Sequence, residues 1–153
     1  MKTKTTLLLI LFSALNFAKI TAQPPVFEWA SKIGGISYDY GSSIATDKNG
    51  NIYTTGYFAD TADFDPGAGV YNLSTLNNSR DIFVQKLDAN KNLIWAKQII
   101  VAGVALAYSI TIDDNENVLI TVQFKDTVDF DPDTGIVQLA PFGRIGINTS
   151  ILS

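Results

Sequence analysis

Two pairs of aspartates have a type and spacing that could do chemistry: Asp63 with Asp65, and Asp129 with Asp131. Residues two apart on a β-strand point to the same face, so each pair would present two carboxylates side by side. Such a pair, with a third aspartate nearby, could bind Ca²⁺ through oxygen ligands. A carboxylate pair could also serve a glycosidase-like active site.

A structural interpretation of the same aspartates competes with the chemical one. Asp65 precedes Pro66 and is therefore biased towards an extended backbone, and its side chain can accept hydrogen bonds from the turn that follows. Gly69 would close this loop. We favour turn formation over metal binding, because sites made only of oxygen ligands generally need six or more of them. Calorimetry with and without a chelator would distinguish the two.

Aspartate and asparagine also alternate in three short segments, at 47–51, 88–92 and 113–117, and the first and third resemble the start of an EF-hand loop. The twelfth position, where an EF-hand has glutamate, is Phe58 counted from Asp47 and Phe124 counted from Asp113. These segments therefore predict hairpin turns, with Gly50 supplying a left-handed backbone. The third segment has no glycine, so we expect Asn115 or Asn117 to take that conformation.

Aromatic residues offer one further candidate for binding. A platform for sugars could be formed by Trp29 and Trp95 together with Tyr38, Tyr40, Tyr53 and Tyr57. The two tryptophans recur at the same place in successive segments, which favours packing in a core. Tyr38 and Tyr40 are less easily assigned to a core, and a binding role stays open for them.

The residue types that are missing exclude much catalytic chemistry. The chain of 153 residues has no cysteine and no histidine, so disulfides, thiol nucleophiles, thiolate or imidazole metal sites and histidine acid–base pairs are ruled out. Its formal net charge is −4. Nucleic acid and anionic lipid are therefore poor partners.

Residues 1–22 have the layout of a secretory signal peptide, a helix that is removed on export. Lys2 and Lys4 precede an apolar run from Leu7 to Leu15, and Ala22 offers a small residue at the cleavage site. A run of about nine residues is well short of the roughly twenty that span a membrane, although an uncleaved anchor is the alternative. Cleavage would leave 8 basic and 15 acidic side chains, which gives the mature chain a net charge of −7. We expect the mature chain not to span a membrane.

The chain repeats its own sequence at a constant offset. The segment TADFDP at 61–66 recurs as TVDFDP at 127–132. Trp29 recurs as Trp95 at the same separation along the chain, and we call this separation the repeat length. The register holds without insertion from Trp29 to Leu73. Within one repeat, β-branched and aromatic segments at about 43–47, 51–58, 81–87 and 93–99 predict four antiparallel strands, with a hairpin inserted between the second and third. Residues 118–124 alternate between two apolar faces, which suits a strand covered on both sides.

These features predict an all-β fold of blade-like, four-stranded antiparallel repeats, an incomplete β-propeller in residues 23–153. An outer strand would occupy 26–33, blade one about 43–99, and a truncated blade two about 109–153. Because a closed propeller has four to eight blades, we expect a fragment of a longer protein, whose open blade edges could self-associate.

In a series of short segments, the chain resembles the bacterial β-propeller repeat family of SBBP type. These segments are Trp29-Ala30, SIATD at 43–47, GNIYTTG at 50–56, DFDPG at 63–67, DIFVQKLD at 81–88 and Trp95-Ala96-Lys97. The resemblance covers about residues 27–139 and implies an exported or surface-attached bacterial protein. The family has no catalytic motif that transfers to this chain. Residues 101–107 depart from the linker at 34–41, which leaves the inner loop of blade two in question.

We therefore expect a secreted or cell-surface protein with a binding or structural role and an unknown protein or glycan partner. We predict no catalytic, cofactor-binding or metal-binding residue, and no enzyme activity. The alternatives are part of a propeller enzyme acting on polysaccharide, and a calcium-stabilised repeat module in which Asp63, Asp65, Asp129 and Asp131 bind the ion.

Overall fold

The structure, a computed structural model, describes residues 24–76, 79–133, 135–141 and 146–152, the last range by its backbone. It forms two compact units, Met1–Ala30 and Ser31–Ser153. The predicted signal peptide at 1–22, with its helix, lies outside the described residues. Residues 24–30, the described part of the first unit, form no strand, and Val26 and Phe27 are exposed.

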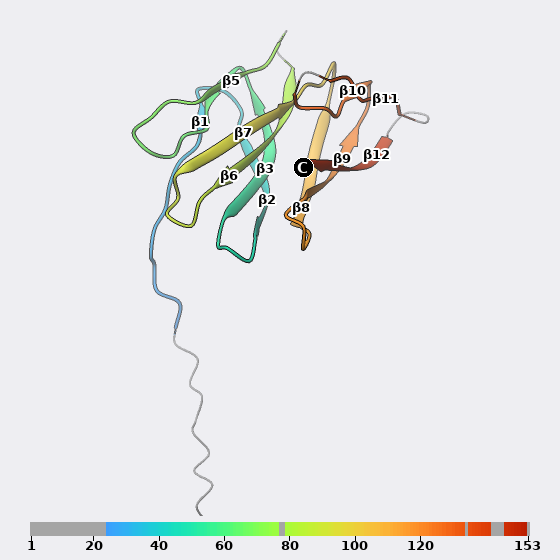
Figure 1. The fold of residues 1–153 in the computed structure, drawn as a ribbon. Helices are drawn as coiled ribbons and strands as arrows, with labels where there is room; N and C mark the ends of the chain where they lie inside the picture. Colours follow the sequence, from blue (N-terminus) through green and yellow to red (C-terminus); the bar gives the residue numbers. More distant parts are fainter. Residues whose placement is uncertain (1–23, 77–78, 134, 142–145, 153) are drawn as a thin grey trace, which may run out of the picture. The chain divides into compact units, whose positions relative to one another are not determined.

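The second unit contains a four-stranded antiparallel sheet with the strand order β2-β3-β6-β7. Its strands are β2 (Tyr40–Thr46), β3 (Ile52–Ala59), β6 (Arg80–Leu87) and β7 (Leu93–Ile99), drawn in Figure 1. Short hairpin turns join β2 to β3 and β6 to β7, whereas residues 60–79 connect β3 to β6. The predicted four-stranded repeat is confirmed, and the described residues contain strands but no helix.

A second antiparallel sheet repeats the first three of these strands. It consists of β8 (Ala105–Ile112), β9 (Val118–Phe124) and β12 (Gly146–Leu152), in the order β12-β9-β8. The β8–β9 pair has a register shift between Ala107 and Ser109, one repeat length after the same shift between Gly41 and Ser43. At the third strand, the two repeats are separated by one residue less than the repeat length. Asp81 pairs with Phe58 in the first sheet, and Gly146 pairs with Phe124 at the same place in the second.

The predicted inserted hairpin is present in both repeats. In the first it comprises β4 (Thr61–Asp63) and β5 (Asn72–Ser74), and in the second β10 (Val128–Asp129) and β11 (Gln138–Leu139). A short strand that the sequence analysis did not predict, β1 (Gly34–Gly35), adds to β4.

The linker before the second sheet keeps this pairing despite its different sequence. Val101 bridges to Val128, and the corresponding pair in the first repeat is Gly35 with Ala62. The departure at 101–107 therefore changes side chains but preserves the connection into the second sheet.

Two hydrophobic clusters cover opposite faces of the first sheet. The larger cluster joins both sheets and contains Tyr53, Ile82, Val84, Ile99, Val101, Ala105, Ala107, Ile110, Val118, Ile120, Val122, Phe124, Val128 and Phe130. The smaller one contains Phe58, Ala62, Phe64, Phe83 and Ala96. Along β9, every second residue from Val118 to Phe124 is buried, as the alternation predicts. The first sheet is thus covered on both faces, which is the environment of a propeller blade.

The outer strand predicted at 26–33 is wrong, because residues 24–33 have no strand structure. The segment has the β-branched and aromatic composition of a strand, but a strand also needs a hydrogen-bonded neighbour. No described strand pairs with it. Ile33 packs against the cluster that contains Phe58 and Phe64.

The turn at 113–117 also differs from the prediction. Glu116 has a φ of 68° and takes the left-handed position, whereas Asn115 and Asn117 do not. Gly50 has a φ of 80° at the corresponding place in the first repeat. The asparagine after the left-handed residue has a different role, because its side-chain amide donates to Asp113 Oδ2 over 2.8 Å.

Candidate functional site

The carboxylates of the first aspartate pair organise the loop between β4 and β5. Asp63 Oδ1 accepts hydrogen bonds from the backbone N–H groups of Asp65 (3.0 Å) and Tyr71 (2.8 Å). Asp65 Oδ1 accepts one from Gly67 N over 2.8 Å. A Cβ atom at Gly69 would lie 2.2 Å from Asp65 Oδ2, so a side chain there would displace the Asp65 carboxylate from its present position.

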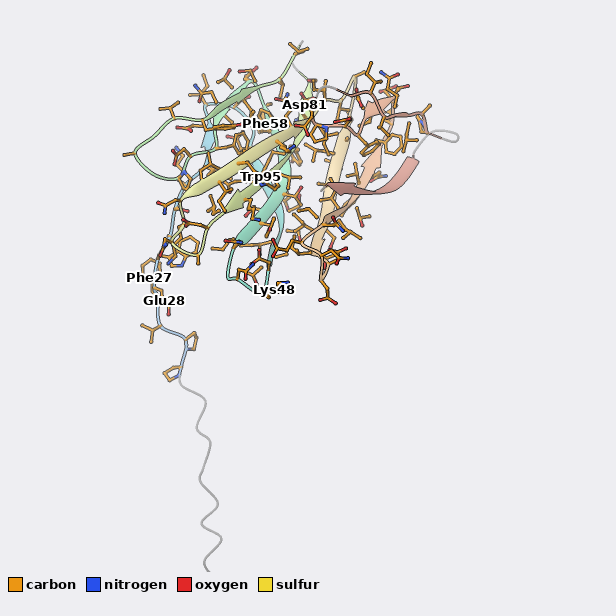
Figure 2. The ribbon with its side chains drawn as sticks, viewed as in Figure 1. Phe27, Glu28, Lys48, Phe58, Asp81 and Trp95 are labelled. Atoms are coloured by element: carbon orange, nitrogen blue, oxygen red, sulfur yellow. The ribbon has the colours of Figure 1, made fainter. Side chains whose placement is uncertain are left out.

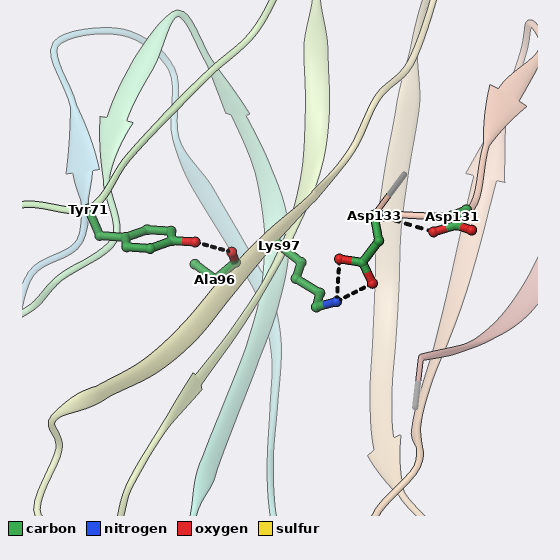
Figure 3. A network of polar contacts seen from close by, with 5 residues as sticks. All are labelled: Tyr71, Ala96, Lys97, Asp131 and Asp133. Carbon is green, nitrogen blue, oxygen red and sulfur yellow. Dashed lines mark hydrogen bonds and ion pairs between the residues drawn. The ribbon is translucent and has the colours of Figure 1, made fainter. Parts of the chain in front are cut away.

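The second aspartate pair makes the same bonds. Asp129 Oδ1 accepts from the N–H groups of Asp131 (3.1 Å) and Val137 (2.8 Å), and Asp131 Oδ1 accepts from Asp133 N (2.9 Å; Figure 3). The predicted turn-forming role is confirmed for both pairs. Within the described part of the chain, no three acidic side chains cluster closely enough to hold a metal ion.

The hydrogen bonds at Asp63 also affect its protonation. The N–H groups of Tyr71 and Asp65 lower the pKa of Asp63, because they stabilise the ionised carboxylate. Asp88 and Asp113 have a lowered pKa for the same reason, with the side-chain amides of Asn92 and Asn117 as the largest cause. The general acid of a glycosidase needs the opposite shift, so Asp63 is poorly suited to that role.

Polar contacts from these loops reach the first sheet. Tyr71 Oη donates to Ala96 O over 3.2 Å, and Lys97 Nζ forms an ion pair with Asp133 at 2.6 Å (Figure 3). Tyr71 lies in the inserted loop of the first repeat and Asp133 in that of the second. Both loops therefore contribute to holding β7 in place.

One tryptophan of the predicted aromatic platform packs with one of its tyrosines at the core. Trp95 is partly buried against the larger cluster and packs edge-to-face with Tyr53, at 6.2 Å between ring centres. Core packing is thus confirmed for Trp95. Trp29 lies in the first unit and is 42% exposed, so the core position predicted for it is not observed.

A cavity of about 330 Å³ lies between the two sheets beside Trp95. Its wall on the first sheet includes Tyr53, Lys86, Trp95 and Lys97, and its wall on the second is the turn at 115–118. Its cations have neighbours already, since Lys97 pairs with Asp133 and Lys86 Nζ lies 5.0 Å from the centre of the Tyr53 ring. This cavity therefore offers less for an incoming ligand than the exposed tyrosines do.

Two exposed tyrosines, Tyr38 and Tyr40, and the partly buried Tyr57 lie close to one cation. Tyr40 and Tyr57 face each other across β2 and β3, and their rings stack at 5.3 Å with an angle of 16°. The Arg80 guanidinium lies 5.5 Å from the ring centre of Tyr38 and 5.7 Å from that of Tyr57. We call Tyr38, Tyr40, Tyr57 and Arg80 the tyrosine–arginine face.

This face occurs in the first repeat alone. In the second repeat, the positions equivalent to Tyr38, Tyr40 and Tyr57 are Val104, Leu106 and Gln123, whereas the turn and core residues Asp63, Phe64 and Phe58 recur unchanged. The residues of the face therefore lie outside the set of turn and core residues that both repeats share. The sequence analysis named the three tyrosines and missed Arg80, because the strand pairing that brings position 80 next to 57 is not a local pattern.

A buried carboxylate was also missed. Asp81 is completely buried and faces Phe58 across β3 and β6 (Figure 2). Its Oδ1 accepts from Val101 N (3.1 Å) and Ser79 Oγ (3.0 Å), and its Oδ2 accepts from Gln98 Nε2 (2.6 Å). Asp81 thereby ties the first sheet to the linker that enters the second, so its role is structural.

Comparison with known proteins agrees with this architecture. Residues 28–57 match the SBBP family, described as a beta-propeller repeat, as the sequence resemblance predicted. The chain also resembles an uncharacterized WD repeat-containing protein, L264, of Acanthamoeba polyphaga mimivirus, with 29% identity over 113 residues. The alignment covers 65% of this chain and 8% of that protein, so the chain spans a small part of the length of its relative.

No solved structure matches the chain significantly. In the part of the chain that the structure describes, no helix is long and apolar enough to cross a membrane. The class that the fold and the comparisons support is therefore a β-propeller repeat protein.

Proposed function

We propose that the chain is part of an exported, non-enzymatic β-propeller repeat protein that binds a glycan at the cell surface. The observation that carries this proposal is the tyrosine–arginine face, an aromatic group with two exposed tyrosines that occurs in the first repeat and not in the second. Tyr38 is 73% exposed and Tyr40 is 57% exposed. Tyrosine combines an apolar ring with a hydroxyl group, which suits a sugar ring with its C–H faces and hydroxyl rim.

Export is inferred from the sequence of residues 1–22. We expect the protein recovered from the medium or the cell surface to begin at Gln23, because peptidases cut after a small residue such as Ala22. N-terminal sequencing measures this directly. A mature protein that still begins at Met1 would contradict export by a cleaved signal peptide.

Binding without catalysis is the second expectation. The purified chain should be retarded in gels that contain a bound polysaccharide, while the number of reducing ends in the polysaccharide stays constant. A panel of neutral and acidic polysaccharides supplies the ligands. Retardation by none of them would overturn the proposal.

Two alternatives have distinct signatures in the same assays. New reducing ends that disappear on Asp63→Asn or Asp129→Asn substitution would identify an enzyme. A melting temperature that falls on adding a chelator would identify a calcium-stabilised repeat. The binding proposal is preferred because the aspartate carboxylates already accept backbone hydrogen bonds from their own loops.

A further inference from the structure

Arg80 has a side chain whose hydrogen-bonding capacity is unused within the described residues. It is exposed, and no acidic oxygen within the described part of the chain forms an ion pair with its guanidinium. The chain has 15 acidic and 11 basic residues, so an arginine at the surface would readily have found an acidic partner. Its neighbours are instead the rings of Tyr38 and Tyr57.

The central carbon of the Arg80 guanidinium lies over both rings. Stacking on aromatic faces uses the flat side of the group and leaves its N–H donors at the edge. The guanidinium donors match the geometry of a carboxylate, which can accept two parallel hydrogen bonds. Arg80 is therefore prepared to receive a carboxylate from outside the chain.

Of three acids that lie close to the residues of this face in sequence or register, two already accept hydrogen bonds, and none pairs with Arg80 in the structure. Asp81, its neighbour on β6, is buried and has both oxygens in hydrogen bonds. Asp39, between Tyr38 and Tyr40, accepts a hydrogen bond from Gly35 N over 2.6 Å. Asp60 follows Ala59, which pairs with Arg80, yet forms no ion pair with it in the structure. These carboxylates make the electrostatic potential around Arg80 more negative, but none of them forms an ion pair with it in the structure.

Beside this cation, the ring of Tyr40 stacks on that of Tyr57, and Tyr40 is exposed to solvent. We propose that the tyrosine–arginine face binds an acidic polysaccharide, with a sugar ring against Tyr40 and one carboxylate on Arg80. This is one local contact, and the negative net charge of the chain, which disfavours polyanions in general, opposes it at longer range. This inference rests on the proposed glycan binding and specifies the class of glycan. A sugar acid such as a uronic acid carries the ring and the carboxylate close together.

Polygalacturonate and its fully methyl-esterified form are the probes, because they share one backbone and differ in the carboxylate. Binding to the full chain is measured by affinity electrophoresis and calorimetry. We expect polygalacturonate to bind at least about tenfold more tightly than the ester, since a charge-assisted hydrogen bond contributes about tenfold or more.

Substitutions locate the site. Arg80→Gln should weaken polygalacturonate binding about tenfold or more, and Arg80→Lys should weaken it less because the charge remains. Tyr57→Ala should weaken binding of both polymers about three- to tenfold. Tyr108→Ala and Lys125→Gln are matched controls, an exposed tyrosine and an exposed lysine of the second repeat, and should leave binding unchanged. Melting temperatures verify that each variant is folded.

The outcomes separate this inference from the proposed function. Equal binding of both polymers, or full binding by Arg80→Gln, would overturn the carboxylate contact while leaving glycan binding intact. Failure to bind any polysaccharide would overturn both. Equally tight binding of polyglutamate would show that the carboxylate is read without the sugar, and would replace the glycan with an acidic peptide.

Discussion

Replacing Phe64 with alanine is expected to lower the free energy of unfolding by about 3–5 kcal/mol, the usual cost of removing a buried phenylalanine. Phe64 is 1% exposed and fills the centre of the smaller cluster. Its ring centre lies 5.2 Å from that of Phe58 and 4.9 Å from that of Phe83. The substitution would leave a cavity that the sheet and the hairpin loop around it can collapse into only partly.

Urea denaturation followed by tryptophan fluorescence measures this loss. Phe27→Ala is the control, since Phe27 is 80% exposed and its removal should change stability by less than about 0.5 kcal/mol. A Phe64→Ala variant with a loss below about 1 kcal/mol would show that the inserted hairpin does not depend on this cluster. The prediction matters for the aspartate loop, because Phe64 lies between Asp63 and Asp65 and anchors both.

Removing the carboxylate of Asp81 is the second substitution with a large expected effect. Asp81→Ala should destabilise the chain by about 2–3 kcal/mol, because it leaves the buried N–H of Val101 without an acceptor. Gln98 Nε2 loses less, since it also donates to Ser74 O over 3.0 Å. The alanine also removes a buried charge, which offsets part of the loss.

Asp81→Asn provides a graded comparison. Asparagine keeps one oxygen for Val101 N and Ser79 Oγ but places a donor towards Gln98 Nε2, so about 1 kcal/mol should be lost. Asp114→Ala serves as the control on an exposed aspartate and should be neutral. Thermal and urea unfolding of the three variants give the comparison. Equal stability of Asp81→Ala and the parent chain would mean that the link between β6 and the linker is dispensable.

These two residues illustrate the difference between repeated and single features. Phe64 recurs as Phe130, which packs edge-to-face on Phe124 as Phe64 does on Phe58. Asp81 has Gly146 at the corresponding register position of the second sheet. Phe64 is therefore part of the plan of both repeats, whereas Asp81 is particular to the junction that follows the first.

The sequence by itself determined the elements whose signals are local. The repeat, its four strands, the inserted hairpin and the aspartate loops all follow from strand alternation and turn chemistry within short stretches of chain, and the structure has them. The turn-forming role of Asp63 and Asp65 was predictable for the same reason. Their hydrogen-bond donors, up to Tyr71, lie within eight residues along the chain.

Tertiary structure decided the features that depend on distant partners. Residues 26–33 have the composition of a strand and yet are not one, because pairing requires an available neighbouring strand. Arg80 joins Tyr38 and Tyr57 only through the β3–β6 register, and Asp81 meets Val101 across twenty residues. Local patterns state what each segment can form, while contacts between segments decide which side chains meet, and in this protein the candidate binding face consists of such contacts.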